Sequence, residues 1–404
     1  MPGTESPLPA YPFEPATCPF DPPAELQRLA DQAPISRVVL ATGKPAWLVT
    51  GHAEIRAMLR DPAFSADFAK PGFPLPREQP EEFDQERNRA GTFIRMDAPE
   101  HTHYRRLLNP EFMIKGVKRL EPLIQETVDD FLSAMVAAGP PADLLEAYAL
   151  PLASMVICHL LGVPYADHAY FQQRSWLLLR PNIPIEEVRQ AADELRMYLS
   201  NLVPAKKGGS DDDLVTRLAA RIDTGELTHD DVVGVSLLLL VGGHESSASM
   251  IALSTMVLLE HPEQYSALAA DPAGAAPVVD ELLRYLTIIR GGLTRVAVDD
   301  TRIGDQTIRA GEGVIVSLAA ANRDKAVFAS PDRFDVARGA LQHMAFGFGV
   351  HQCIGQPLAR AELRIALVAL AKRLPGLRLA VPAGKVPLST DSVVFGVRKL
   401  PVAW

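Results

Sequence analysis

The residues best suited to bind a metal lie in a glycine-rich segment near the end of the chain. Residues 346–355 read FGFGVHQCIG, so Cys353 follows two glycines and precedes a third. Glycines let a backbone approach a flat ligand closely, and N–H groups at the start of a helix favour a thiolate over a thiol. A thiolate is a strong metal ligand, but a lone cysteine is more often a buried free thiol. Cys353 by itself therefore leaves both interpretations open.

A second group of polar residues interrupts the most apolar stretch of the chain. Residues 242–247 read GGHESS in the middle of a helix predicted over 229–260. Each glycine inside a helix costs about 1 kcal/mol relative to alanine, so the pair indicates a kink or a close approach to another group. Glu245 and Ser246 place a carboxyl group beside a hydroxyl group, which can move protons; a core helix with a polar kink is the alternative. A zinc hydrolase is excluded, because its His-Glu-x-x-His spacing needs histidine where Ala248 stands.

A third motif is a pair of opposite charges. Glu281 and Arg284 are three residues apart, so they share one face of a helix predicted over 274–286 and can form an ion pair. On an exposed helix face such a pair contributes only a few tenths of a kcal/mol. The spacing alone therefore says little about function.

Together these motifs resemble the cytochrome P-450 family, whose haem-binding loop matches residues 346–355 position for position. The family also has a Glu-x-x-Arg pair behind the haem, and a partner segment of that pair that residues 331–334 match. Its central helix carries [Ala/Gly]-Gly-x-[Asp/Glu]-Thr, but this chain has Ser246 in place of the threonine. Serine keeps the hydroxyl and lacks the β-branch that restricts χ1, so we expect less ordered proton delivery and more release of peroxide. Matching flanks extend the resemblance over nearly the whole chain, and especially to actinobacterial members that oxidise xenobiotics and secondary metabolites.

The resemblance implies a site for haem b. Cys353 would ligate the iron, with Phe346 and Gly355 beside the cofactor, and Glu245 and Ser246 would help deliver protons during dioxygen activation. The family's contacts to the haem propionates correspond to His101, Arg105, Arg295 and His351. The segments that line its substrate pocket correspond to Phe93, Ile94, Leu238, Val241, Gly242, Ile289, Arg290, Val393 and Val394.

Most of these pocket positions are apolar, which suits a lipophilic substrate. Arg290 is the exception, and we expect it to turn to solvent, because charges are rarely buried unpaired. The loops at 66–95 and 178–186 are expected to set specificity, since long irregular segments in a compact chain are usually functional or mobile.

The elements that would position these residues are mainly helices. We expect a mainly α fold with minor β-structure and one domain over 1–404. Its helix-rich part covers about 85–286, with small sheets near 36–50, 290–320 and 376–404. The resemblance places the haem between the long central helix and the helix after the cysteine loop. The helices are predicted at 52–60, 100–109, 115–138, 142–161, 166–180, 184–202, 211–222, 229–260 with Thr228 as N-cap, 274–286 and 356–373. We also predict a hairpin over 38–49 and a strand pair over 392–404.

Bulk composition narrows the partners and the compartment. A net charge of −9 disfavours nucleic acid and anionic membranes. Three widely spaced cysteines do not form a disulfide framework and fit a reducing cytoplasm. We expect no secretory signal in the first residues and no membrane anchor, and we expect a monomer.

The expected function is that of a monooxygenase that hydroxylates or epoxidises a lipophilic small molecule. The chain has no second cysteine cluster, so its electrons should come from NAD(P)H through a ferredoxin reductase and a ferredoxin. Acidic ferredoxins would be drawn to a basic patch. The resemblance places the cations of such a patch near the proximal face, on the cysteine side of the haem. They are Arg105, Arg106, Lys115, Lys118, Arg119, Arg360 and Arg364. A nitric oxide reductase of the same family and a non-catalytic haem sensor are the alternatives, and the Glu245–Ser246 pair weighs against both.

Overall fold

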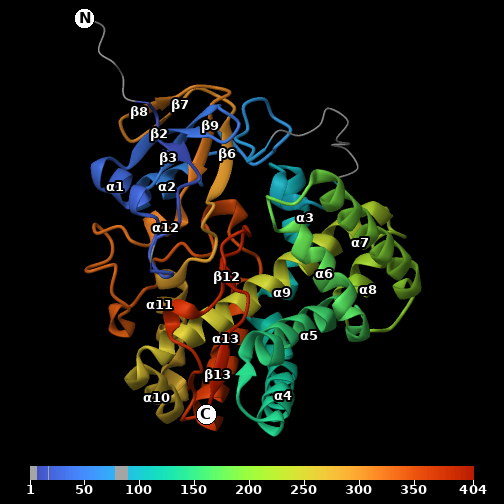
Figure 1. Cartoon of the computed structure of the whole chain (residues 1–404). Helices are drawn as coiled ribbons and strands as arrows, with labels where there is room; N and C mark the ends of the chain where they lie inside the picture. The colour runs from blue at the N-terminus through green and yellow to red at the C-terminus, as the bar shows by residue number, and fades with distance from the viewer. Residues whose placement is uncertain (1–6, 17, 78–89) are drawn as a thin grey trace, which may run out of the picture.

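The computed structural model describes residues 7–16, 18–77 and 90–404, and helices dominate this part of the chain. Figure 1 shows a small sheet at one end and a body of helices below it, with the C-terminus at the far end from the sheet. The α-helices are α1 (Ala24–Gln32), α2 (His52–Met58), α3 (Glu100–Phe112), α4 (Ile114–Ala138), α5 (Leu150–Leu161), α6 (His168–Leu178), α7 (Ile185–Lys206), α8 (Leu214–Ala219), α9 (His229–Leu259), α10 (Pro262–Ala270), α11 (Ala275–Leu286), α12 (Leu318–Ala321) and α13 (Gln356–Arg373).

Short strands form one larger sheet and three small ones. The strands are β1 (Ala10–Tyr11), β2 (Ile35–Leu40), β3 (Pro45–Val49), β4 (Phe64–Ser65), β5 (Ala142–Asp143), β6 (Leu293–Ala297), β7 (Thr301–Ile303), β8 (Gln306–Ile308), β9 (Gly313–Val316), β10 (Arg378–Leu379), β11 (Leu388–Ser389), β12 (Gly396–Val397) and β13 (Pro401–Ala403). The larger sheet has the order β1-β2-β3-β9-β6-β4, so it joins segments that lie more than 200 residues apart. Its β2–β3 hairpin pairs antiparallel, with Ile35 opposite Val49.

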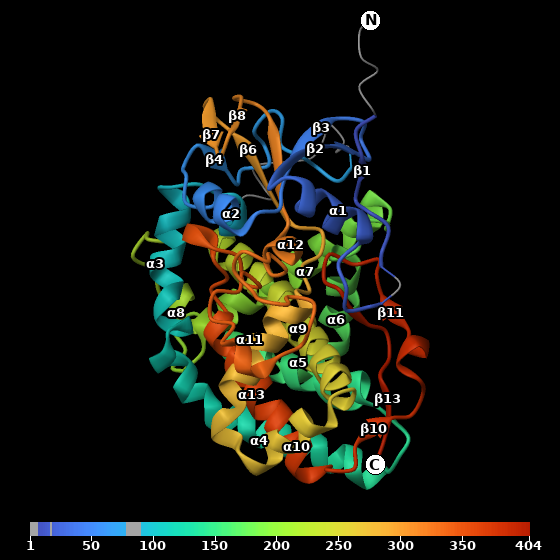
Figure 2. The same ribbon diagram turned by 90° about the vertical axis from the view of Figure 1, so that its left-hand side faces the viewer.

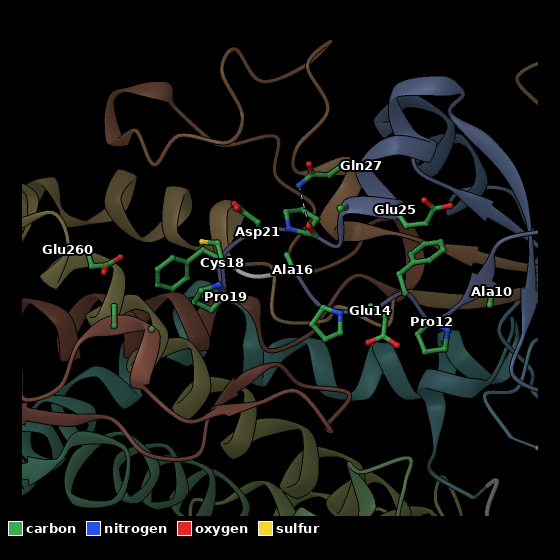
Figure 3. Close-up of a pocket in the computed structure, with 17 residues that line it drawn as sticks. Ala10, Pro12, Glu14, Ala16, Cys18, Pro19, Asp21, Glu25, Gln27 and Glu260 are labelled. Carbon is green, nitrogen blue, oxygen red and sulfur yellow. Dashed lines mark hydrogen bonds between the residues drawn. The ribbon is translucent and has the colours of Figure 1, made fainter.

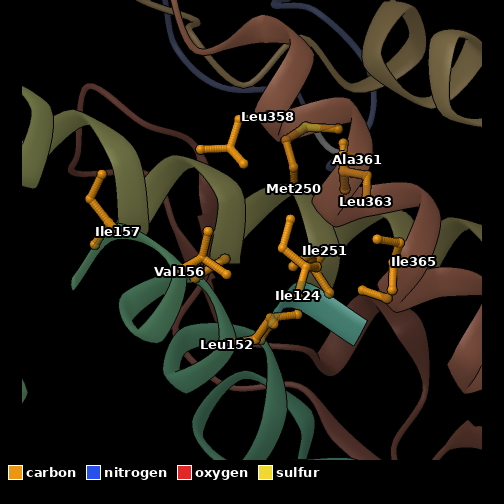
Figure 4. Close-up of a cluster of buried hydrophobic side chains, with 14 of the residues drawn as sticks. Ile124, Leu152, Val156, Ile157, Met250, Ile251, Leu358, Ala361, Leu363 and Ile365 are labelled. Carbon is orange, nitrogen blue, oxygen red and sulfur yellow. The ribbon is translucent and has the colours of Figure 1, made fainter. Parts of the chain in front are cut away.

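Helix α9 runs through the helical body and organises its core. Its first turn is fixed by a capping box in which the Thr228 hydroxyl accepts from the Asp231 N–H and the Asp231 carboxylate accepts from Thr228. The main core cluster brings Ile124 of α4, Leu152 of α5 and Ile251 of α9 together with α13 (Figure 4). This packing holds α9 and α13 against each other behind the site described below.

The long apolar helix α9 could cross a membrane by length and composition alone, and it is the one such helix found in the described residues. Two thirds of its most apolar window, 67%, is buried inside the fold. A core helix of a globular protein has the same composition.

Several of the predicted elements differ from the structure. The helix predicted over 142–161 is divided into β5, a π-helix at Leu145–Ala149 and α5. The strands within 392–404 exist but do not pair with each other, because β12 pairs with β11 and β13 pairs with β10 and β5. No helix was predicted at α1 or α10.

Candidate active site

The cysteine loop, residues 346–355, is fixed by backbone contacts at both ends. The Cys353 N–H donates to the Phe346 carbonyl at 2.9 Å, and α13 begins directly after Gly355. Gly349 has φ +74°, and a Cβ there would collide with the Leu59 carbonyl after α2. The loop therefore depends on glycine to pack against α2.

The Cys353 side chain is exposed although the loop around it is packed. A Cβ placed on Gly355 would meet only the Cys353 Sγ, at 3.9 Å, so the space next to the thiol is open. Part of the Cys353 side chain is reached by solvent, but the protein atoms packed around it raise the pKa of the thiol by desolvation, while the Gly355 N–H, the Arg105 guanidinium and the Gln356 N–H oppose that rise. Open space beside a thiol that faces backbone donors and cations suits a thiolate metal ligand.

The middle of α9 offers a second open surface. A Cβ on Gly242 would meet nothing within 4 Å, whereas a Cβ on Gly243 would meet the Ile157 Cδ1 of α5 at 2.7 Å. The two glycines thus have different roles in the structure. Gly243 permits close packing of α9 on α5, whereas Gly242 borders open space. The Ser246 hydroxyl donates to the Gly242 carbonyl at 2.7 Å across one helical turn.

Glu245 is the carboxyl group next to this opening. The Arg180 Nη1 lies 3.3 Å from its Oε1, and the Arg180 side chain is almost fully buried. Burial raises the pKa of Glu245, while the charge of Arg180 and the hydrogen bond from it lower the pKa. The two effects oppose each other, as is useful in a group that must both release and regain a proton.

Four cationic or neutral donors gather beside the cysteine loop. The rings of His101 and His351 lie 4.1 Å apart between centroids, and Arg105 donates to the Gln352 carbonyl at 2.9 Å. Burial, followed by the nearby guanidinium groups, lowers the pKa of His101 to about 4 and that of His351 to about 3. Burial also lowers the pKa of Arg295 to about 10.

This donor cluster has unused hydrogen-bonding capacity. The His101 Nε2 is buried without a partner, and among the described residues Arg105 and Arg295 form no ion pair. Buried donors without partners cost free energy, so an anionic group is expected to accept from them. A haem with its iron at Cys353 carries two propionates, which are negatively charged and accept hydrogen bonds. The residues therefore fit that cofactor.

Behind the loop, Glu281 and Arg284 form a fully buried ion pair at 2.7 Å. Arg284 also donates to the carbonyls of Asn322, Pro331 and Arg333, so segment 331–334 does pack against the pair. Each charge is satisfied by several hydrogen bonds, as a buried ion pair requires.

Comparisons with known proteins agree with this geometry. Residues 276–400 match the family model described as Cytochrome P450. The chain is 49% identical to Cytochrome P450-SU2 of Streptomyces griseolus, over 96% of this chain and 94% of that protein. It is 47% identical to pentalenic acid synthase of Streptomyces avermitilis, over 100% and 99%. The crystal structure of the mycinamicin VIII C21 methyl hydroxylase MycCI from Micromonospora griseorubida, bound to mycinamicin VIII, superposes with a TM-score of 0.92 at 37% identity, covering 98% of this chain and 100% of that one.

The chain belongs to the cytochrome P450 family.

Membership confirms the predicted fold class, mainly α with minor β, and the assignment as an actinobacterial-type P450 oxidoreductase that uses haem.

The structure divides the predicted pocket residues into two groups. Those with accessible surface are Ile94, Leu238, Val241, Gly242, Ile289, Arg290 and Val393. Phe93 and Val394 are buried, and Phe93 packs beside the rings of Tyr104 and His101, so we assign Phe93 to the core that supports α3. Phe346 lies under the Arg360 guanidinium, 4.7 Å from ring centroid to Cζ.

Arg290 does not turn to solvent, so that expectation is wrong. Its guanidinium lies 3.4 Å from the Phe395 ring centroid, and its Nη2 donates to the Pro19 carbonyl. Burial lowers its pKa to about 10. Stacking on an aromatic ring and one backbone acceptor satisfy the charge without an ion pair. The sequence gives no sign that the N-terminal segment, which supplies this acceptor, lies next to Arg290.

Two polar residues near the site were missed from the sequence. Arg180 pairs with Glu245, and Glu362 of α13 is buried with an unpartnered Oε2 and a hydrogen bond from Ser247. Neither position has a local signal, because each gains its role from helices that are distant in sequence.

A separate hollow of about 1110 Å³ lies along residues 10–27, between Phe13, Glu14 and Glu260 at the end of α9 (Figure 3). None of the predicted site residues lines it. We therefore assign it no part in the chemistry.

Proposed function

We propose that this P450 inserts one oxygen atom from dioxygen into a lipophilic secondary metabolite or xenobiotic, by hydroxylation or epoxidation. Half-buried apolar residues at the open face of α9, Leu238 and Val241, support a lipophilic substrate. The names of two relatives point the same way: one makes pentalenic acid, and another hydroxylates a methyl group of mycinamicin VIII. The observation that carries the proposal is the cluster beside the exposed thiol of Cys353, in which the buried His101 Nε2 has no hydrogen-bond partner and Arg105 and Arg295 have no ion pair among the described residues.

In this proposal haem b would lie between α9 and α13, where Cys353 would ligate its iron and Phe346 and Gly355 would lie beside it. His101, Arg105, Arg295 and His351 hold its propionates. The bound haem supplies dioxygen activation and electron transfer, which no side chain can provide.

The chain's own residues move protons and position substrate. Ser246 donates to the Gly242 carbonyl, which leaves its oxygen lone pairs available to accept a hydrogen bond from water or substrate. Glu245 can pass a proton towards that hydroxyl when it separates from Arg180, because burial raises the pKa of the carboxyl group and the contact with Arg180 opposes that rise. The apolar residues of α9 exclude water beyond that needed for proton transfer.

We further propose that a ferredoxin and a ferredoxin reductase carry electrons from NAD(P)H, that residues 1–404 form one P450 domain, and that the protein is a cytoplasmic monomer. All three cysteines are free, which fits a reducing compartment.

The test uses isotopically labelled dioxygen. The haem-loaded protein is screened with terpenoids and macrolides for a shift of the Soret band, and compounds that shift it are incubated with NADPH, a plant-type ferredoxin and its reductase under ¹⁸O₂. We expect a product heavier by one ¹⁸O atom. NADH-dependent conversion of nitric oxide to nitrous oxide without labelled product would favour the reductase alternative instead, and tight compound binding without any turnover would favour a sensor.

A further inference from the structure

A second buried carboxylate stands next to Glu281 on α11, and it contacts α13 instead of the ion pair behind the loop. The Asp280 Oδ1 accepts from the Arg360 Nε of α13 at 2.9 Å, and Asp280 is only 8% exposed. Figure 2 shows α11 alongside α13. Burial raises the pKa of Asp280, but hydrogen bonds from His343 and Arg360 outweigh burial and lower it. Asp280 is therefore an anion at neutral pH, and little water screens its charge.

Arg360 in turn lies on the aromatic ring that begins the cysteine loop. Its Cζ is 4.7 Å from the ring centroid of Phe346, and its Nη1 donates to the Gln356 Oε1 at 2.9 Å. The Phe346 carbonyl accepts from the Cys353 N–H. Burial raises the pKa of Cys353, and the charge of Arg360 is among the effects that lower it. The guanidinium thus acts on the cysteine both through the loop that holds it and through its charge.

His343 contacts the same carboxylate from the segment before the loop. Its Nδ1 accepts from the Ala345 N–H at 3.2 Å, so the neutral ring carries its proton on Nε2. That Nε2 lies 3.4 Å from the Asp280 Oδ1 and donates to it. The Arg360 Nη2 lies 3.1 Å from Nε2, which has no free lone pair for it. Asp280 is therefore the acceptor that holds both donors together.

The charges of Asp280 and Arg360 have opposite effects on a haem whose iron is bound by Cys353. Reduction adds one electron to the haem and therefore one negative charge. A positive charge near the thiolate favours the reduced state, and a negative charge disfavours it. Asp280 offsets the effect of Arg360 and also fixes where the guanidinium lies.

We propose that Asp280 is a positioning residue that lowers the reduction potential of the haem, because it holds Arg360 against Phe346 and offsets the charge of Arg360. A haem with a lower potential takes an electron less readily from any donor. This inference rests on the proposed function, from which it takes the haem and its ligand Cys353.

The test is the midpoint potential of the haem-loaded protein without substrate, measured by dithionite titration with mediator dyes. Asp280→Asn removes the charge and keeps the shape, so it should shift the equilibrium at least about threefold towards the ferrous state. A tenfold shift corresponds to about 59 mV for one electron. Arg360→Gln removes the positive charge and should shift the same equilibrium at least about threefold towards the ferric state.

The opposite signs separate a charge effect from loosened packing, which would move both variants in one direction. The double variant Asp280→Asn with Arg360→Gln should return close to the potential of the unmodified protein, because the two changes cancel. Arg360→Lys keeps the charge and should shift the potential much less than Arg360→Gln. If Asp280→Asn does not retain haem, the two Arg360 variants still decide the sign.

The matched control is Asp213→Asn, which makes the same change of charge at another buried aspartate. Asp213 is 5% exposed, lies 2.7 Å from the Lys206 Nζ and caps α8. Figure 1 shows α8 at the opposite edge of the helical body from α11. Its potential should stay close to that of the unmodified protein.

Shifts of the same sign in Asp280→Asn and Arg360→Gln, no shift in either, or an equal shift in Asp213→Asn would overturn this role of Asp280. The spectrum of each dithionite-reduced variant with carbon monoxide is recorded in parallel and should keep the thiolate band. Its loss in Asp280→Asn and Arg360→Lys would mean that the contact only holds the loop, which also overturns the proposal. Absence of the thiolate band in the unmodified protein would instead overturn the proposed function, and this inference with it.

Discussion

At the residue scale, the account depends on what each polar side chain near the opening of α9 can reach. Ser246 keeps the hydroxyl and its bond to the Gly242 carbonyl, but it has no γ-methyl group to hold its rotamer. Glu245 has a buried arginine as its partner. In the proposed proton delivery, the Ser246 contact is therefore less restrained than the Glu245 contact.

Replacing Ser246 tests this contribution. Ser246→Ala should lower product formed per NAD(P)H on the order of tenfold, less than the roughly 10²–10⁴-fold that a positioned proton donor can contribute, because water can partly replace the hydroxyl. Ser246→Thr should raise that ratio and lower peroxide release, since the methyl group restricts χ1. Both are measured by comparing product, peroxide and NAD(P)H consumed. Full coupling in the unmodified enzyme, unchanged by threonine, would contradict the hypothesis.

Glu362 gives a prediction about pH. Burial raises its pKa to about 8, against an ordinary value of 4.5. Between these values the folded protein holds a proton that the unfolded chain has released, so the stability from this group is complete below about pH 4.5 and is lost as pH rises through about 8. Glu362→Gln removes that dependence. Thermal unfolding from pH 5 to 8 should show the unmodified protein losing stability relative to the glutamine variant, and parallel curves would contradict the assignment.

At the element scale, helix ends were predictable where a local signal existed. The predicted helix over 229–260 agrees with α9 to within one residue at each end. Its signals were the capping residue Thr228 and the charged residues that bound the chain's longest apolar run. The start of α10 has only weak signals, Pro262 and the acidic Glu263 in its first turn. The division of 142–161 reflects pairing of β5 with β13, which lies about 260 residues away. The predicted pairing of the strands within 392–404 was wrong for the same reason, because tertiary neighbours decide which strands pair and in which register.

Two ion pairs with the same spacing allow a matched test of burial. Arg284→Ala removes the 2.7 Å partner of the buried Glu281, which among the described residues keeps only Arg338 at 3.3 Å as a charge partner, and should cost about 3–5 kcal/mol of stability, with loss of haem retention. Arg28→Ala breaks the exposed pair with Glu25, also at i,i+3, and should cost far less stability, because water and salt screen both charges. Urea unfolding measures both, and similar costs for the two variants would show that the buried pair has no special part in holding the loop.

Two glycines with similar backbone angles test the packing of α2 on the cysteine loop. Gly339 has φ +69° with nothing near its Cβ position, and Gly349 has φ +74° facing the Leu59 carbonyl. Gly339→Ala should cost about 1–2 kcal/mol through left-handed strain alone. Gly349→Ala should cost more and weaken haem binding, as measured by unfolding and by haem titration; equal costs would mean that the close approach to α2 is unimportant.

At the scale of the whole molecule, the site is assembled from segments that only the complete fold brings together. The sequence motifs identified Cys353 and the α9 group, because both are local runs of residues. They did not show that Arg290 contacts the N-terminal segment, or that carboxylates of α4 and α11 neutralise the predicted patch. Charge partners depend on tertiary contacts, so a list of cations from the sequence overstates the positive surface.

The central claim is that Cys353 is the thiolate ligand of a bound haem. The most direct measurement is the absorbance spectrum of the dithionite-reduced protein with carbon monoxide, recorded for the unmodified chain and for Cys353→Ala. The account predicts a strongly red-shifted Soret band that is absent in the alanine variant. A Soret position typical of histidine or neutral thiol ligation in the unmodified chain, or a red-shifted band that survives in Cys353→Ala, would contradict it.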